Sequence, residues 1–205
     1  MIKATLFTNS FYLNNRQFDI GDEVANVNDC LYGFYLLKKK FMEKGIDLST
    51  QDINPPAESK FIIYNDIPMF EDIIPGNYLL LVESMVVYPE NWNKNKHKLF
   101  KKIFTWDDTS IDNKKYIKIN YSHKIPENLN FNIEKKKKLC VMVNSNKYYN
   151  HPLELYSERI HAIQWFEKNH PEDFDLYGFG WDRYIFKGIF KKLNKIEFLT
   201  KFLAP

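Results

Sequence analysis

The chain has 205 residues, of which 44 % are apolar and 17 % aromatic; this is enough apolar surface for a packed core and excludes disorder over most of the length. Its 29 basic and 26 acidic residues leave a net charge of +3, too small to indicate a nucleic-acid partner. The two cysteines, Cys30 and Cys140, lack C-x-x-C spacing; we expect buried free thiols and no zinc site.

The first half of the chain contains short apolar segments typical of strands and one helical pattern. Residues 2–7 are predicted to form the first strand. A helix is predicted between Asn28 and Lys44, because apolar residues recur there at near-helical spacing and Gly45 follows as a stop signal. After a loop at Pro55-Pro56, the other predicted strands are 61–64, 78–82, 103–106 and 116–121.

A change of composition between residues 126 and 138 indicates a linker. Asparagines alternate there with apolar residues, and a lysine run, Lys135 to Lys138, follows. The predicted domains are therefore 1–132 and 138–205. The lysine run is either a solvated face or a patch that attracts anionic lipid or a polyanionic donor.

The most informative segment extends from residue 139 to residue 181. LCVMVNSN is typical of a buried strand and a loop, LELYSERIHAIQWFEKNHP of an amphipathic helix, and FDLYGFGW of a second buried strand. This βαβ unit predicts an α/β fold with a ligand crevice at the strand's carboxyl end, where helix N-termini favour phosphate. We expect a nucleotide or sugar-nucleotide binder. A sheet of two or three strands is marginal alone, so this half is predicted to be the start of a doubly wound domain.

The expected location is the cytoplasm, with contact to a membrane surface at most. No apolar run approaches about 18 residues, and the N-terminal MIKATLFTN lacks a signal-peptide core. The segment 186–202 is basic and apolar and is predicted to be helical in part.

Glu83 is the candidate general base. It ends the apolar run LLLVE, so we expect its carboxylate at the mouth of a cleft and partly desolvated, which raises a carboxyl pKa. The alternative is an ordinary strand-end glutamate facing water. Trp92 and Trp106 fall at strand ends or loops, where aromatic faces can stack on acceptor sugars, whereas Trp165 has the helical spacing of a core residue. Asp107 and Asp108 are adjacent, so we predict a turn or cap rather than a metal site.

The turn after the second-half strand holds the candidate phosphate-binding residues Asn144, Ser145 and Asn146. Short polar side chains and free backbone N–H groups suit phosphate, and they suit a turn-and-cap role equally well. At the end of the next strand, Gly178 would permit a close backbone approach to a ligand, or Tyr177 and Gly178 form a simple turn.

Three parts of the chain resemble bacterial members of the α-1,3/1,4-fucosyltransferase family. They are LLLVESMVVYPENW (79–92), FKKIFTWDDTS (100–110), and the block formed by KLCVMVNSNK (138–147), ELYSERIHAIQWF (154–166) and FDLYGFGWD (174–182). The family has two facing Rossmann-like domains of the glycosyltransferase B type. The resemblance implies a Rossmann-like acceptor domain in 1–132 and the start of a GDP-fucose domain from 138.

The resemblance also implies a reaction and a set of roles. Fucose would pass from GDP-fucose, with inversion, to a GlcNAc-type hydroxyl of a surface glycan such as a lipopolysaccharide O-antigen. Glu83 would be the base, and Arg159 would offset charge on the leaving diphosphate without a metal or other cofactor. The alternative for Arg159 is a helix-surface residue paired with Glu158 or Glu154. Tyr177 and Gly178 match a Tyr-Gly of the family.

One departure from the family pattern concerns the donor site. Residues 194–202, NKIEFLTKF, are similar to the stretch before the family's donor signature, but the following Glu-Asn and Tyr-x-Thr-Glu-Lys motifs are absent. Two further interpretations are therefore open. The chain is a truncated or split relative that binds glycan or needs a second chain or a missing C-terminal segment, or it uses another sugar nucleotide.

Overall fold

The computed structural model describes residues 1–69, 73–121, 123–128, 132–184, 186 and 188–203, without the side chains of 188 and 191. The chain divides into two compact units, Met1–Glu127 and Asn128–Pro205. No helix in the described ranges combines the length and the apolar character needed to cross a membrane.

The first unit is built on a six-stranded parallel sheet. Its strands are β1 (Ile2–Phe7), β2 (Ile46–Thr50), β3 (Ile62–Asn65), β4 (Tyr78–Leu81), β5 (Lys102–Thr105) and β6 (Tyr116–Lys118). The spatial order is β2-β1-β3-β4-β5-β6, and every neighbouring pair is parallel. The predicted α/β class is confirmed, and the topology is compatible with a Rossmann-like domain. Strand order reverses at β1, which places a topological switch point beside β3.

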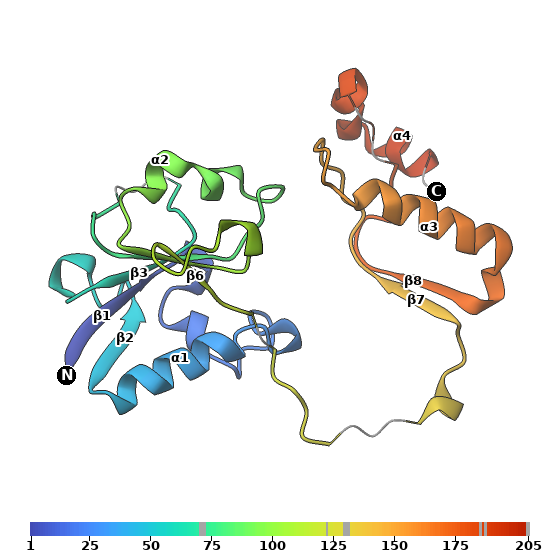
Figure 1. Cartoon of the computed structure of the whole chain (residues 1–205). Coiled ribbons are helices and arrows are strands. Elements are labelled where there is room, and N and C mark those ends of the chain that lie inside the picture. Colours follow the sequence, from blue (N-terminus) through green and yellow to red (C-terminus); the bar gives the residue numbers. More distant parts are fainter. Residues whose placement is uncertain (70–72, 122, 129–131, 185, 187, 204–205) are drawn as a thin grey trace. The chain divides into compact units, whose positions relative to one another are not determined.

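Both faces of this sheet are covered, as a parallel sheet requires. Figure 1 shows α1 (Tyr32–Glu43) and α2 (Lys94–His97) on opposite sides of it. One core contains Ala4, Leu6, Phe18, Leu48 and Ile63 and packs against α1. The other contains Ile62, Tyr64, Ile67, Leu79, Leu81, Phe100 and Ile103. Short 3-10 helices connect the elements: Ser10–Tyr12, Arg16–Phe18, Val27–Asp29, Pro56–Glu58, Pro89–Trp92 and Asp108–Ser110.

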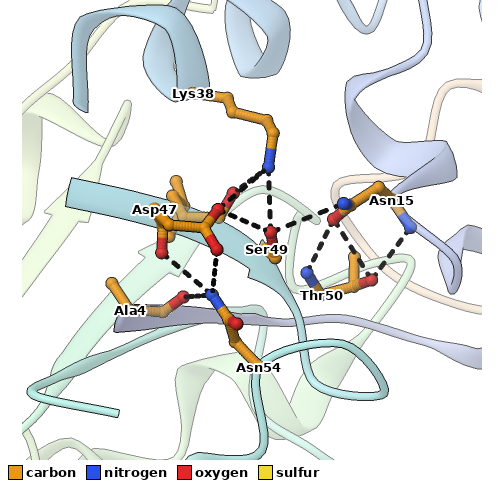
Figure 2. A network of polar contacts seen from close by, with 8 residues as sticks. Ala4, Asn15, Lys38, Asp47, Ser49, Thr50 and Asn54 are labelled. Atoms are coloured by element: carbon orange, nitrogen blue, oxygen red, sulfur yellow. Dashed lines mark hydrogen bonds and ion pairs between the residues drawn. The ribbon is translucent and has the colours of Figure 1, made fainter. Parts of the chain in front are cut away.

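The edge strand β2 is not among the predicted strands. Its sequence, IDLST, has only two apolar residues, so the pattern that identifies a strand is weak. Neighbouring polar side chains secure it instead (Figure 2). Asn15, at φ +60°, donates its N–H to Thr50 Oγ1 (2.9 Å) and accepts the N–H of Thr50 on Oδ1 (3.0 Å). Asn15 thus pairs with both the backbone N–H and the side-chain hydroxyl of Thr50, the last residue of β2.

A lysine and a carboxylate complete this network (Figure 2). Lys38 Nζ donates to the Leu48 carbonyl (2.5 Å) and to Ser49 Oγ (2.9 Å), and it lies 3.5 Å from Asp47 Oδ1. The side-chain amide of Asn54 donates to the Asp47 carboxylate (3.2 Å). Burial acts to raise the pKa of Asp47, but hydrogen bonds from Ser49 and Asn54 and the Lys38 charge outweigh it and hold the pKa below its ordinary value.

Asp47→Asn is expected to lower the free energy of unfolding of this unit by about 1 kcal/mol at pH 7, because a charge-assisted, partly exposed network is lost. Since the folded pKa is depressed, the stabilisation is present above the unfolded pKa of about 3.9 and is lost as pH falls through the folded pKa. Urea unfolding at neutral and acidic pH measures the difference. Glu58→Gln, which breaks an exposed ion pair with Lys3, is the control and should change little. A difference independent of pH would contradict this account.

The second unit contains the predicted βαβ segment. It consists of β7 (Cys140–Val143), α3 (Tyr156–Asn169) and β8 (Phe174–Tyr177), with β7 and β8 parallel. It also has 3-10 helices at Ile133–Lys135, Pro171–Asp173 and Gly188–Lys195, and the short helix α4 (Glu197–Phe202). Its buried residues within the described ranges are Ile163, Phe174 and Thr200. Leu139, Val141 and Val143 are exposed along β7, so one face of the two-stranded sheet is open to solvent.

Two predictions about burial are wrong. Trp165 is 53 % exposed rather than a core residue, because the sheet is only two strands wide and covers a narrow stripe of α3 around Ile163. The thiols of Cys30 and Cys140 are free, but Cys30 is exposed and Cys140 is only half-buried. Cys30 lies in the turn before α1, and Cys140 lies on the two-stranded sheet.

Candidate functional site

The carboxyl ends of four neighbouring strands bring polar and aromatic residues to one edge of the first unit. Asp66 follows β3, Glu83 follows β4, Trp106 follows β5, and Tyr121 follows β6. Because parallel strands end on the same side, this edge is where open α/β sheets bind ligands. It is therefore the candidate site.

Asp66 is the half-buried carboxylate of this edge. Its Oδ1 accepts hydrogen bonds from the backbone N–H of Val82 (2.6 Å) and of Glu83 (3.2 Å) and from the side-chain amide of Asn91 (2.7 Å). Burial raises the pKa of Asp66, and these hydrogen bonds oppose that rise in part. The residue has φ +65°, which aspartate tolerates better than most residues. Asp66 thereby ties the end of β3 to the end of β4.

Asn91 extends this connection into the core. It is 0 % exposed; its Oδ1 accepts the N–H of Ile67 (2.8 Å), and its amide also donates to the Glu83 carbonyl (3.3 Å). The carbonyl of Asn91 lies 2.7 Å from Nε2 of the buried His97, whose Nδ1 lies 2.9 Å from the Tyr116 hydroxyl. Burial lowers the pKa of His97, which favours the neutral imidazole. The backbone of Glu83 is consequently held on both its N–H and its carbonyl.

The two predicted acceptor tryptophans lie together beside this segment. Trp106 Nε1 donates to the carbonyl of Val82 (3.1 Å), the residue before Glu83. The rings of Trp92 and Trp106 are 6.0 Å apart in an edge-to-face arrangement. Trp106 is 37 % exposed, whereas Nε1 of Trp92 is buried without a hydrogen-bond partner among the described residues. Trp106 thus offers the more accessible surface for stacking.

Two tyrosines that the sequence analysis did not single out, Tyr12 and Tyr121, have pKa values raised in part by the charge of Glu83. Tyr121 donates its hydroxyl to the Leu81 carbonyl (2.9 Å); burial raises its pKa, and the charges of Asp66 and Glu83 add to the rise. Burial also raises the pKa of Tyr12, to which Cys30 and Glu83 contribute. Both phenols are therefore held in the neutral form near Glu83, and the O–H of Tyr121 is already used in its bond to Leu81.

The exposure of the carboxylates at this edge differs from the prediction. Glu83 is exposed, so the partial desolvation predicted for it is instead found at Asp66. The reason is that Asp66 accepts hydrogen bonds from the backbone of the segment after β4, which shields its carboxylate in part, while the Glu83 side chain is exposed to solvent. An exposed carboxylate near the indole of Trp106 and the phenol of Tyr121 can accept a proton from a bound hydroxyl. Asp66 had a weak signal, an acidic residue directly after a buried strand and two residues before Pro68.

In the second unit, two backbone N–H groups of the predicted phosphate-binding loop are hydrogen-bonded to β8 and to the residues after it. The backbone N–H of Asn144 donates to the Tyr177 carbonyl (2.9 Å), and that of Asn146 donates to the Phe179 carbonyl (2.8 Å). The prediction of free N–H groups is therefore wrong at these two positions. The Asn146 side chain bonds to the carbonyls of Gly180 and Arg183 (both 2.9 Å), a turn-stabilising role. Ser145 lies between them and is half-buried.

The N-terminus of α3, which follows this loop in the chain, is already capped by the carboxylate of Glu154. The carboxylate of Glu154 accepts the N–H groups of Tyr156 (2.5 Å) and Ser157 (3.1 Å) at the start of α3. A phosphate would have to compete with it for these donors. Arg159 lies with its guanidinium 4.9 Å from the centre of the Tyr156 ring, while Glu158 pairs with His161 (3.5 Å). No hydrogen bond or ion pair joins Arg159 to Asn144, Ser145 or Asn146 in the described part of this unit.

Gly178 permits a close approach between two backbone segments rather than an approach to a ligand. At φ +135°, a Cβ on this residue would lie 1.8 Å from the carbonyl oxygen of Asn144. That carbonyl also accepts Nε1–H of Trp181 (2.7 Å). The side-chain oxygen of Asn144 is buried, with no partner among the described residues. The turn interpretation therefore describes Gly178 better, while Tyr177 is exposed.

No protein-family model, curated protein or solved structure matches this chain. Among the described residues, no group of three or more His, Cys, Asp or Glu side chains is placed to hold a metal ion.

Gly178→Ala is expected to destabilise the second unit by more than about 2 kcal/mol, because strain at positive φ adds to a backbone clash. Gly180→Ala is the matched control: its φ is +82°, but the nearest atom to a Cβ is 3.6 Å away, so it should cost only about 1 kcal/mol. Hydrogen exchange of the β7 and β8 amides measures both. Equal loss of protection in the two variants would show that the approach to Asn144 is unimportant.

Proposed function

We propose that this chain takes part in the transfer of fucose from GDP-fucose, with inversion, to a GlcNAc-type hydroxyl of a surface glycan such as a lipopolysaccharide O-antigen. The observation that carries the proposal is the edge of the first unit, where Asp66 and Asn91 hold the backbone of an exposed Glu83 next to Trp106. The three resembling segments add support, since the first begins on β4 and includes Glu83 and the second begins just before β5 and includes Trp106. The proposed scaffold is a glycosyltransferase of the B type, with acceptor domain 1–132 and the start of a donor domain at 138–205.

The proposed chemistry is a single displacement. The acceptor hydroxyl oxygen forms a bond to the anomeric carbon of fucose as Glu83 takes its proton, and the bond between that carbon and the diphosphate oxygen breaks with its electron pair leaving on GDP. Arg159 would offset the charge on the diphosphate, and Trp106 would stack on an acceptor sugar. No metal or other cofactor is part of this scheme. The proposed setting is the cytoplasm, with contact to a membrane surface at most.

A second function has its own support. Glu154 occupies the N-terminus of α3, and the N–H groups of Asn144 and Asn146 are bonded to β8, so the second unit offers few ready donors for a diphosphate. These contacts favour a chain that binds glycan without catalysing transfer, or that gains its donor site from another segment or chain. A transferase for a different sugar nucleotide is the third candidate.

The first test separates donor binding from its absence. Calorimetric titration of GDP-fucose, GDP and UDP into the purified chain should give saturable binding of the two guanosine nucleotides only. Arg159→Ala should weaken binding at least tenfold, because a charge-assisted contact to phosphate is lost. Arg183→Ala is the control, since Arg183 is an exposed arginine of the same unit that lies 3.6 Å from Asp182. Preference for UDP would support the third candidate, and no binding at millimolar nucleotide would support the second.

A kinetic test addresses the base. Glu83→Gln should lower kcat for fucosyl transfer by about 100-fold or more, with little change in acceptor binding, because the amide cannot take the hydroxyl proton. Glu90→Gln is the matched control: Glu90 lies seven residues further on and pairs with Lys96 (2.8 Å). Transfer near the wild-type rate in Glu83→Gln would remove Glu83 from the mechanism.

A further inference from the structure

The α1-facing side of the first unit is incompletely filled. A cavity of about 540 Å³ lies between α1 and strands β3 to β5. Its wall contains Phe34 and Leu37 from α1 and Ile63, Leu80 and Phe104 from the sheet. Except for the buried Ile63, these apolar side chains are only half-buried, although they lie between a helix and a parallel sheet. The volume is within the range of small-molecule sites, about 300–1,000 Å³.

The cavity has a polar end, and that end lies on the side of the candidate site. Along β4 the wall passes from Leu80 to Val82, which directly precedes Glu83. The same end is lined by Asn120, Tyr121, His123 and Cys30. The hydroxyl of Tyr121 donates to the carbonyl of Leu81 (2.9 Å), two residues before Glu83, which places this phenol at the candidate site. One ligand could therefore place a polar group beside Glu83 and an apolar group in the cavity.

The lining decides which part of a ligand fits inside. A sugar ring carries hydroxyl groups on every side, and each would lose its hydrogen bonds to water against Phe34, Leu37 and Phe104. An alkyl chain or an aryl ring loses nothing there and gains from leaving water. The polar atoms at the end near Tyr121 suit the junction between such a group and a sugar.

We propose that this cavity binds the alkyl or aryl aglycone of the acceptor, so that the acceptor is an amphipathic glycoside with its sugar at Glu83. The identity of the sugar rests on the proposed function, whereas the apolar occupant rests on the cavity alone. The acceptor class is thereby narrowed to glycans attached to an apolar group.

The test compares matched ligands below their micelle concentrations. Octyl β-N-acetylglucosaminide should bind the wild-type chain at least tenfold more tightly in calorimetry than methyl β-N-acetylglucosaminide, because the added methylenes leave water. Two independent substitutions that fill the cavity, Leu80→Trp and Gly33→Leu, should abolish the octyl advantage. Met42→Trp is the control, because Met42 lies on α1, is 43 % exposed and does not line the cavity.

The outcomes separate this inference from the proposed function. One outcome is that octyl glucoside binds as tightly as octyl N-acetylglucosaminide, and that Leu80→Trp weakens the binding of both octyl glycosides. In that case the cavity assignment stands and the choice of a GlcNAc-type acceptor fails. If the octyl and methyl glycosides bind equally, or if Leu80→Trp and Gly33→Leu retain the octyl advantage, the cavity assignment is overturned. A change of sedimentation in Leu80→Trp without alkyl binding would assign the cavity to a second copy of the chain and also overturn it.

Discussion

The hydrogen bonds made by Asp66 are the constraint on which the candidate site depends. One carboxylate oxygen collects two backbone N–H groups from the end of β4 and the amide of Asn91. Without this acceptor, the Asn91 amide and the Val82 N–H, which are partly shielded from water, would lose a charge-assisted hydrogen bond. The direction of the chain at Glu83, and hence the position of its exposed carboxylate, follows from this arrangement. The buried His97 helps to hold Asn91 in place, because its Nε2 lies 2.7 Å from the Asn91 carbonyl oxygen.

The two units differ in how completely their sheets are covered. In the first unit, six parallel strands have a core on each face, so the strand ends can hold functional side chains on a rigid base. In the second unit, two strands and α3 leave Val141 and Val143 exposed, and a sheet of this width is marginal alone. In the first unit, side chains such as Asp66 and Asn91 hold the strand ends, while in the second unit the N–H groups of Asn144 and Asn146 bond to the carbonyls of Tyr177 and Phe179.

In the first unit, polar side chains at the strand ends lie next to an apolar cavity. Asp66, Glu83 and the phenol of Tyr121 lie at the carboxyl ends of the strands, and the lining of the cavity beside α1 includes Val82, next to Glu83. A ligand that uses both regions must itself be amphipathic. The proposed transfer reaction and the proposed aglycone pocket thus draw on adjacent parts of one sheet edge, yet each can fail without the other.

The sequence by itself determined the α/β class, five of the six strands of the first unit, and the βαβ segment, because apolar runs and turn residues are local signals. Only the tertiary structure decided the rest. The strand β2 pairs with β1, and the side chains of Asn15 and Lys38, which lie outside it, satisfy its polar residues. Asp66 is the half-buried carboxylate and Glu83 the exposed one because the backbone after β4 donates its N–H groups to Asp66. Trp165 is exposed because the sheet beside α3 is narrow, and the Asn144 and Asn146 N–H groups are occupied because β8 pairs alongside them. Burial and hydrogen-bond partnership depend on residues far apart in sequence, and no local pattern carries that information.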